Sequence, residues 1–384
     1  MKIAVVWNHA SRLLDCSFRF ERYLHGLREL GHEPILVCHE GCEAGFPAAV
    51  RVFPAAAFEY PETWREVGAE VALVVTWIRM SATLDAMRRA GMSIVAISDS
   101  DGLIGARTHP RETFAKLWIH QRGPRARIRC VRFWCGKYLR GYLAEDEEHL
   151  RSTRLSDVLV LGSRVARRNF LRFLRRYGEE RLGEKVIVVP FNIGETFLSC
   201  PLPDAKDDRI AAIGRWADPQ KNVGLLVAAV ERLAKRRPST RLVVLGSGGR
   251  TAFAPLVGGP VDYLGEVGQA EVARTLATAR SIVFSSHWEG SPHAAFEALA
   301  SGATLIGTPI PSLLSWSEGG RFGRIAPKAT PAALARAMLD EMANWDRGER
   351  DLHAISGEWR RRLAPDVICR DLLAALGSSA ARSG

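Results

Sequence analysis

Short apolar runs alternate with amphipathic stretches along the first half of the chain. The apolar runs have the length of strands and are rich in β-branched residues: KIAVVWN, EPILVCH, EVALVVTW, SIVAISDS, DVLVLGS and KVIVVPFN. Helical patterns separate some of them, over residues 18–30 and 81–90 and in the basic stretch after DVLVLGS. Continuous apolar strands separated by helices are typical of a parallel sheet that helices cover on both faces. The pattern predicts a doubly wound α/β domain.

The same alternation starts again after the polar segment PLPDAKDD. Strand-like RIAAIGR, RLVVLGSGG, SIVFSS and ATLIGT alternate with helical patterns over residues 223–235, 269–279 and 292–300. The linker at 192–208 is rich in Pro and Asp, as domain boundaries often are. We therefore expect two Rossmann-like domains, residues 1–195 and 196–365. Residues 366–384 are expected to form a C-terminal helix that packs back on the first domain, and a tail.

The carboxyl ends of the strands are where a doubly wound sheet binds its ligand. Two such sheets that face each other would hold a substrate in the cleft between them. Residues that follow a strand are therefore the first candidates for chemistry.

The composition allows both domains a proper core and argues against a membrane-spanning or secreted protein. Hydrophobic residues make up 47% of the 384, and no apolar run approaches the roughly 18–20 residues that cross a bilayer. The first residues, MKIAVVWN, lack the longer apolar stretch and the cleavage site of a secretory signal. Because the seven cysteines are odd in number and scattered, we expect reduced thiols and a cytoplasmic protein.

One group of metal-ligating residue types stands near the N-terminus: His32, Cys38, His39 and Cys42. Cys38 and its neighbours end an apolar strand, and no second pair of ligands follows at the spacing of a zinc site. We therefore expect no metal.

Positive charge is concentrated in one segment. Residues 107–181 hold 19 Lys and Arg against 8 Asp and Glu, a difference equal to the whole net charge of +11. Cations there interleave with aromatic residues in KLWIHQRGPRARIRCVRFWCGKYLRGYL, which suits the anionic headgroups of a membrane. The pattern also suits a nucleic acid or a phosphorylated acceptor, and a solvated helical face with aromatic rings in the core explains it equally. We favour the membrane surface and rank nucleic acid last.

Two carboxylates, Glu289 and Glu297, lie eight positions apart in HWEGSPHAAFEALASG. Ser291 suits a helix N-cap and Pro292 suits a first helical residue, which predicts a helix start between the two carboxylates. Glu289 then lies in the loop and Glu297 in the helix. The unpaired backbone N–H groups at that helix end, including that of His293, would form an anion site.

Two cations, Arg215 and Lys221, flank a turn in IGRWADPQKN, directly after a strand. A departing nucleoside diphosphate gains negative charge, which preorganised Arg and Lys side chains stabilise without a metal. The loop LGSGG, with Gly246, Ser247 and Gly248, permits close backbone approach to a nucleotide. Singly, each of these residues fits an ordinary loop, but their order along one α/β domain favours a ligand site.

From about residue 209 to 309 the chain resembles the donor domain of retaining glycosyltransferases of family four, which have the GT-B fold. The resemblance is carried by a strand that ends in Gly-Arg followed by Lys221, and by the Glu-x7-Glu pattern EGSPHAAFE. It implies that Arg215 and Lys221 hold the donor diphosphate. It also implies that Glu297 binds the ribose hydroxyls and that Glu289 binds the transferred sugar.

Further contacts follow from the same resemblance. The backbone of Gly290, Ser291 and Pro292 would touch the sugar, and the region from Gly265 to Val267 would frame the base. The resemblance implies a nucleotide-sugar donor carrying UDP, GDP or ADP, and no further cofactor.

The N-terminal half departs from this family pattern. Family members often have a Gly-Gly pair after the first strand, whereas this chain reads WNHASRLLDCSFRF. Asp99 and Asp101 end a strand in SDSDG, and we expect them to line the cleft and to orient an acceptor hydroxyl. His109 is a weaker candidate of the same kind.

The sequence thus predicts an α/β protein of the GT-B type, with two Rossmann-like doubly wound parallel sheets that face each other across a cleft. We expect a retaining glycosyltransferase that moves a sugar from a nucleotide-diphosphate sugar to a hydroxyl acceptor, in cell-surface glycan or glycolipid synthesis at the inner membrane face. The acceptor would be a glycan, a lipid-linked sugar or a small molecule. A GT-B epimerase or phosphorylase, or a non-catalytic binding module, are the alternatives.

Overall fold

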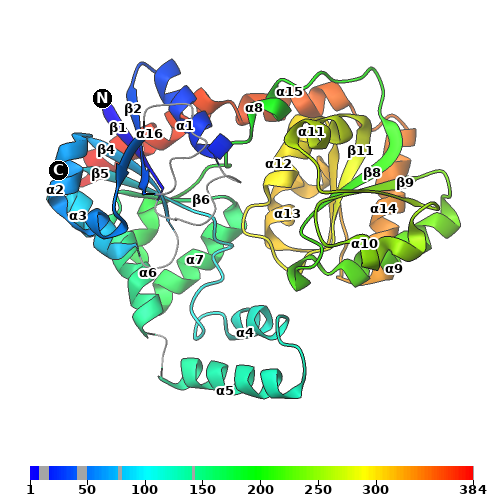
Figure 1. Ribbon diagram of the computed structural model, residues 1–384, viewed down its shortest axis with the longest axis horizontal. Coiled ribbons are helices and arrows are strands. Elements are labelled where there is room, and N and C mark those ends of the chain that lie inside the picture. The colour runs from blue at the N-terminus through cyan, green and yellow to red at the C-terminus, as the bar shows by residue number, and fades with distance from the viewer. Residues whose placement is uncertain (8–16, 41–49, 77–79, 141–142, 384) are drawn as a thin grey trace. The chain divides into compact units, whose positions relative to one another are not determined.

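The computed structural model of the chain describes residues 1–7, 17–40, 50–76, 80–140 and 143–383, and it divides into two compact units (Figure 1). The N-terminal unit comprises Met1–Asn192 together with Ala364–Gly384, and the C-terminal unit comprises Ile193–Leu363. The loop that follows the first strand, residues 8–16, lies outside the described residues, as does Cys42.

A seven-stranded parallel sheet with the order β3-β2-β1-β4-β5-β6-β7 forms the centre of the N-terminal unit. Its strands are β1 (Lys2–Val6), β2 (Glu33–His39), β3 (Val50–Phe53), β4 (Val71–Thr76), β5 (Ser93–Ser98), β6 (Val158–Leu161) and β7 (Val186–Val188). Its helices are α1 (Ser17–Glu29), α2 (Pro61–Val67), α3 (Ser81–Arg89), α4 (Pro110–Trp118), α5 (Pro124–Arg140), α6 (Leu143–Leu155), α7 (Arg164–Arg176) and α16 (Pro365–Ser383). Short 3-10 helices occupy Ala55–Glu59 and Glu180–Lys185.

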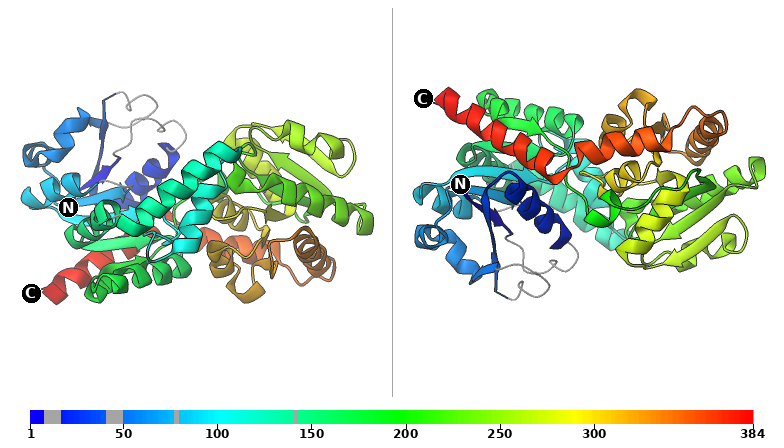
Figure 2. Two further views of the ribbon diagram at one scale, coloured as in Figure 1. Left: turned by 90° about the horizontal axis from the view of Figure 1, so that it is seen from below. Right: turned by 90° about the horizontal axis from the view of Figure 1, so that it is seen from above.

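The last helix, α16, packs against α1 in this unit (Figure 2). Gly26 of α1 makes room for it, because a Cβ atom there would lie 2.3 Å from the carbonyl oxygen of Pro365. The thiol of Cys369 is buried beside the carbonyl oxygen of Tyr23, at 3.7 Å. Burial raises the pKa of that thiol to about 12, so it stays protonated.

A six-stranded parallel sheet with the order β10-β9-β8-β11-β12-β13 forms the centre of the C-terminal unit. Its strands are β8 (Asp207–Ile213), β9 (Arg241–Leu245), β10 (Val261–Gly265), β11 (Ala279–Phe284), β12 (Thr304–Gly307) and β13 (Gly323–Ile325). Its helices are α8 (Glu195–Leu198), α9 (Val223–Arg236), α10 (Arg250–Phe253), α11 (Gln269–Thr278), α12 (His293–Ala300), α13 (Pro311–Trp316), α14 (Pro331–Asp346) and α15 (Leu352–Arg362). Short 3-10 helices occupy Pro219–Lys221, Ala254–Leu256 and Glu318–Gly320.

Helices cover both faces of the second sheet (Figure 1). Leu226 and Leu233 of α9 and Met338 of α14 are fully buried against one face, in a core they share with the strands. Helices α11 and α12 contact the strands as well, and in Figure 1 they lie on the opposite side from α9 and α14. The predicted fold class, α/β with two doubly wound parallel sheets, is confirmed.

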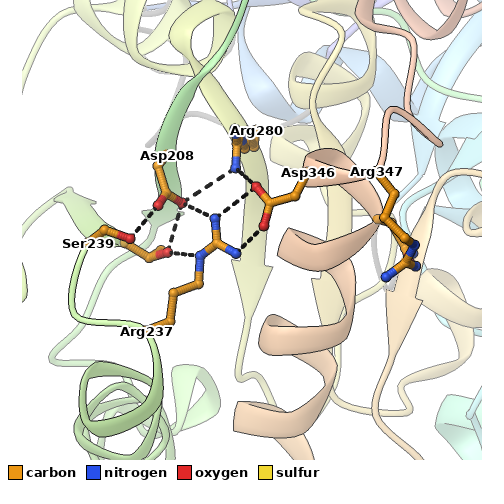
Figure 3. Close-up of polar contacts among 8 residues, drawn as sticks. Asp208, Arg237, Ser239, Arg280, Asp346 and Arg347 are labelled. Carbon is orange, nitrogen blue, oxygen red and sulfur yellow. Dashed lines mark hydrogen bonds and ion pairs between the residues drawn. The ribbon is translucent and has the colours of Figure 1, made fainter.

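A polar network ties together the amino ends of this sheet (Figure 3). Asp208 at the start of β8 accepts hydrogen bonds from Arg237, at 3.1 Å, and from the hydroxyl group of Ser239, at 2.8 Å. Arg237 also pairs with Asp346 at the end of α14, which Arg280 of β11 contacts at 2.8 Å. Hydrogen bonds from Arg237 hold the pKa of Asp346 down at about 2, so this carboxylate is ionised throughout the physiological range.

None of the described helices is long and apolar enough to cross a bilayer.

Candidate functional site

Loops from three neighbouring strands meet at the carboxyl edge of the C-terminal sheet. Strand β8 lies between β9 and β11, so the segments 214–222, 246–249 and 285–292 leave the sheet side by side. The edge where parallel strands end is the usual ligand-binding edge of a doubly wound sheet. These segments contain most of the residues that the sequence singled out.

The ammonium group of Lys221 and the carboxylate of Glu289 form an ion pair at this edge. Lys221 Nζ lies 2.6 Å from Oε1 of Glu289. The hydroxyl group of Ser286 donates to the same oxygen at 2.6 Å, and the amide of Gln220 donates to Oε2 at 3.3 Å. Because Glu289 is only 8% exposed, these donors replace most of the water that a free carboxylate would bind.

Backbone contacts hold the two loops that carry this pair. The Gln220 side chain donates to the carbonyl oxygen of Trp288 at 2.7 Å, and the backbone N–H of His287 donates to the Gln220 carbonyl at 2.9 Å. The hydroxyl group of Ser285 donates to the carbonyl oxygen of Lys221 at 2.6 Å. The site is therefore preorganised, since both side chains stand on loops that are hydrogen-bonded to each other.

Arg215 remains more exposed than Lys221. Its side chain is 63% exposed, and its guanidinium lies 3.4 Å from the carboxylate of Asp218. Asp218 also accepts the backbone N–H of Gln220 at 2.9 Å, which caps the 3-10 turn Pro219–Lys221. The two predicted cations thus emerge from one turn, one paired with Glu289 and the other facing solvent.

The glycine loop packs tightly on the loop that carries Arg215. A Cβ atom on Gly246 would lie 2.0 Å from the carbonyl oxygen of Gly214, and one on Gly248 would lie 2.7 Å from the Cβ of Ala217. Both glycines have positive φ angles, 105° and 75°, which favour glycine. Loop packing therefore explains both glycines without a ligand, and it leaves Ser247 between them exposed.

The segment predicted to frame the base lies next to the glycine loop. The backbone N–H of Gly246 donates to the carbonyl oxygen of Gly265, at 2.6 Å, where β10 ends. The hydroxyl group of Tyr263 bridges the same loop, donating to Gly246 O at 3.3 Å and accepting from Gly249 N at 3.2 Å. Val267 follows as a half-buried residue. The segment predicted to frame the base and the predicted nucleotide loop are thus joined by direct contacts.

Helix α12 begins one residue later than predicted. Pro292 is its N-cap, with ψ at 105°, and no side chain caps the helix. The prediction of Ser291 as N-cap and Pro292 as first helical residue is therefore wrong, because an extended ψ cannot continue into a helix. Ser291 is buried beside Gly290, and Glu297 lies half-buried on the second turn of α12.

In the N-terminal unit, Asp101 is already engaged. Its carboxylate lies 2.6 Å from Lys116 Nζ and accepts the backbone N–H of Leu103 at 3.1 Å, and its side chain is 7% exposed. Asp99 lies half-buried two residues earlier, after β5. Asp101 thus serves as an anchor for α4, and a catalytic role for either carboxylate remains a prediction.

His109 is buried in the same loop, and its Nε2 lies 3.2 Å from the carbonyl oxygen of Asn169. Burial lowers the pKa of this imidazole, which favours its neutral form.

No cluster of three or more metal-ligating side chains occurs among the residues that the structure describes. Of the four candidate ligands near the N-terminus, His39 stacks on the ring of Phe58 at 4.3 Å, as a core histidine does.

Sequence reasoning missed Ser286 and Gln220, which hold Glu289 in place. Ser286 is a polar residue directly after an apolar strand, and Gln220 precedes the predicted cation Lys221. Both positions follow a strand, which is the signal that could have identified them.

Known proteins resemble part of this chain in sequence. Residues 207–344 match the family described as Glycosyl transferases group 1. The phosphatidyl-myo-inositol mannosyltransferase of Mycolicibacterium smegmatis is 25% identical over 174 residues, covering 43% of this chain and 45% of that relative. The chain therefore spans less than half the length of this relative.

Solved structures share the fold over nearly the whole chain. HepE of Anabaena, solved in complex with UDP, has a TM-score of 0.66 and 14% identity over 98% of this chain and 100% of that chain. Sucrose-phosphate synthase of Thermosynechococcus elongatus has a TM-score of 0.59 and 14% identity over 100% of this chain and 98% of that chain. This likeness shows the fold, which is GT-B.

Proposed function

We propose that the chain is a glycosyltransferase that transfers a sugar from a nucleoside-diphosphate sugar to a hydroxyl acceptor, as the match of residues 207–344 to the family Glycosyl transferases group 1 supports. The observation that carries the proposal is the buried pair of Lys221 and Glu289, which lies inside the matched region at the carboxyl edge of the sheet. A carboxylate held there suits sugar hydroxyls, and two cations beside it suit a diphosphate.

In this proposal the donor occupies the strand ends from β10 to α12. Arg215 and Lys221 bind the diphosphate, and Glu289 binds the sugar. The glycine loop of Gly246, Ser247 and Gly248 lies beside the nucleotide, and Glu297 binds the ribose. Lys221 can remain paired with the carboxylate of Glu289 while it binds a phosphate oxygen, because an ammonium group has three N–H donors. The bound UDP of HepE supports a nucleoside diphosphate as ligand, with UDP, GDP and ADP as the candidates here.

The region from Gly265 to Val267 would contact the base, and the backbone of Gly290, Ser291 and Pro292 would contact the sugar. These contacts are proposals that rest on the position of each segment around the glycine loop and α12.

We propose that the reaction retains the anomeric configuration. The bond between the anomeric carbon and the diphosphate oxygen breaks, and the acceptor oxygen bonds to the same face of that carbon. The acceptor proton passes to a diphosphate oxygen, so the products are the glycosylated acceptor and the nucleoside diphosphate. Arg215 and Lys221 stabilise the leaving charge, worth roughly 3 kcal/mol for a well-placed donor. A dedicated protein base is then not required, which is compatible with the engagement of Asp101 by Lys116.

We further propose an acceptor that belongs to a cell-surface glycan or glycolipid, made at the cytoplasmic face of a membrane. The mannosyltransferase relative is named for a phosphatidyl-myo-inositol acceptor, which supports a lipid-linked substrate over a small molecule.

Nucleotide-induced stabilisation tests the donor site. At about 100 times its dissociation constant, the matching diphosphate adds about 2.7 kcal/mol of stability, which raises the Tm of a unit of this size by roughly 5–10 °C. The variant R215Q should fold normally, because the side chain is exposed, and should lose most of this shift. The matched control is R236Q, an exposed arginine at the end of α9, which should keep it.

The proposal is wrong if none of UDP, GDP and ADP stabilises the protein, or if R215Q responds as strongly as the wild type. Turnover is then measured with the matching nucleotide sugar, with and without a lipid-linked acceptor. Conversion of the sugar without any acceptor would indicate an epimerase, and binding without transfer across acceptors would indicate a non-catalytic module.

A further inference from the structure

Exposed apolar side chains gather on helix α5 of the N-terminal unit. Of the ten large hydrophobic residues that are exposed in the described part of the chain, five lie on this one helix: Ile128, Val131, Phe133, Tyr138 and Leu139. Leu139 is 74% exposed and Ile128 is 59% exposed. Single exposed apolar residues are ordinary, but a cluster on one helix marks an interaction surface.

The inner face of α5 is already occupied by α4, and Figure 1 shows the two helices side by side. The ring of Trp134 packs edge-on against Phe114 of α4, with centroids 5.2 Å apart, and stacks on Tyr138. Cys130 on the same face is buried. Arg107 donates to the carbonyl oxygens at the end of α5, each at 3.0 Å, and so fixes that end of the helix. The outer face of α5 is therefore the side of the helix opposite to α4.

A continuous apolar stripe runs along this outer face. Ile128, Val131, Cys135 and Leu139 are spaced by three, four and four residues, which places them on one line of a helix. The helix has 17 residues and is therefore about 25 Å long. A helix of this length can lie flat on a partner surface along its whole apolar stripe.

Arginines flank the stripe. Residues 110–140 contain nine Lys and Arg and one Glu, so they hold eight of the eleven excess positive charges of the chain. Arg125, Arg129 and Arg132 are exposed and form a second line beside the stripe. Among the described residues, ion pairs with carboxylates engage Lys116 and Lys137 but none of these three arginines.

We propose that the outer face of α5 lies in the headgroup layer of an anionic lipid bilayer. The apolar stripe enters the acyl boundary, and the arginines beside it pair with anionic headgroups. A nucleic acid would neutralise the arginines but would leave the apolar stripe in water. A bilayer contacts both the apolar stripe and the arginines. This inference concerns the N-terminal unit alone and does not rest on the donor site.

Vesicle co-sedimentation of the full chain tests the proposal. We expect binding to vesicles of phosphatidylcholine with about a third phosphatidylglycerol, and little binding to phosphatidylcholine alone, with a decline as salt screens the charges. The variant R129Q/R132Q should bind about 25-fold more weakly, since each arginine contributes about 5-fold. I128S/L139S should bind at least about 10-fold more weakly, because it removes the apolar part of the stripe.

Matched controls separate α5 from general charge and general hydrophobicity. R168Q/R175Q removes two exposed arginines of α7, and V257S/L314S removes two exposed aliphatic side chains of the C-terminal unit. Both controls should bind vesicles as the wild type does. Since all these side chains are exposed, the Tm of each variant should stay close to that of the wild type.

Several results would overturn the proposal. The wild type could bind both vesicle types equally or neither, or the α7 control could lose as much affinity as R129Q/R132Q. Unchanged vesicle binding by I128S/L139S would exclude the apolar stripe as a lipid contact. A lipid-free dimer that I128S/L139S abolishes, seen by sedimentation velocity, would assign the stripe to a second copy of the chain instead.

Discussion

Lys206 should contribute more to the stability of the C-terminal unit than any exposed cation. It is 8% exposed, and its ammonium group donates to three carbonyl oxygens: Leu276 at 3.0 Å, Ala277 at 2.8 Å and Ser301 at 2.9 Å. These carbonyls lie at the carboxyl ends of α11 and α12, where helices leave backbone acceptors unpaired and carry partial negative charge. One side chain thus caps two helices.

The variant K206M keeps the length of the side chain and removes all three hydrogen bonds. An unsatisfied buried acceptor costs about 1–3 kcal/mol, and three acceptors would cost more, but the variant also avoids burying a charge. We therefore expect a net loss of about 2–4 kcal/mol. For a unit of this size that lowers the Tm by roughly 5–15 °C. K235M, at an exposed position of α9, is the control and should change the Tm by little.

The same lysine predicts a pH dependence. Burial lowers the pKa of Lys206 to about 7, whereas an unfolded lysine titrates near 10.4. Between these values the unfolded chain binds more protons than the folded one, so the wild type gains stability as the pH rises from 7 to 9, by about 2 kcal/mol. K206M lacks this gain. Thermal melts of both proteins at pH 7, 8 and 9 measure it. A K206M melting temperature within about 2 °C of the wild type at pH 7, the pH of the three at which most of the ammonium form remains, would refute the capping role.

Two further predictions concern the fold around the site. G246A should lose at least about 3 kcal/mol of stability, because a Cβ atom there would lie 2.0 Å from the carbonyl oxygen of Gly214 and φ is 105°. G258A, with open space around the added Cβ, should lose only about 1 kcal/mol. Urea unfolding of both variants measures the two losses. D346N should cost under about 1 kcal/mol at pH 7, because this carboxylate is 43% exposed and solvent screens its pairs with Arg237 and Arg280. Since the pKa of Asp346 is lowered to about 2, its contribution is present above pH 4 and is lost as the pH falls toward 2, so wild type and D346N should converge in Tm at pH 2.

Most of the strands that the sequence revealed are buried on both faces. Strand β8 and its neighbour β11 read as apolar runs because helices cover both sides of them. Three strands were missed, and none carries such a run: β3 and β10 are half-exposed at sheet edges, and β13 has three residues that begin with Gly323. A Cβ atom on Gly323 would lie 1.9 Å from the carbonyl oxygen of Leu305. This close strand contact requires glycine, which weakens any strand pattern.

The candidate site was predictable as a set of positions but not as a set of contacts. Spacing after the strands identified Lys221 and Glu289, which are 68 residues apart in the chain. It could not show that Glu289 is buried, or that the hydroxyl group of Ser286 donates a hydrogen bond to its carboxylate, because both depend on how the loops pack. The pairing of Asp101 with Lys116 was hidden for the same reason, since α4 has to fold back on its own loop.

Two ion-pair clusters in the C-terminal unit lie at opposite edges of the sheet, and this difference in position bears on the role of each. The network of Arg237 and Asp346 joins strand starts to helix ends, so its structural purpose is evident (Figure 3). The pair of Lys221 and Glu289 is more deeply buried, with side chains 17% and 10% exposed, and an apolar pair there would cost the fold less. It stands at the strand ends where ligands bind. A costly charge pair at that edge supports the proposed donor site, whereas the glycines beside it are explained by packing alone.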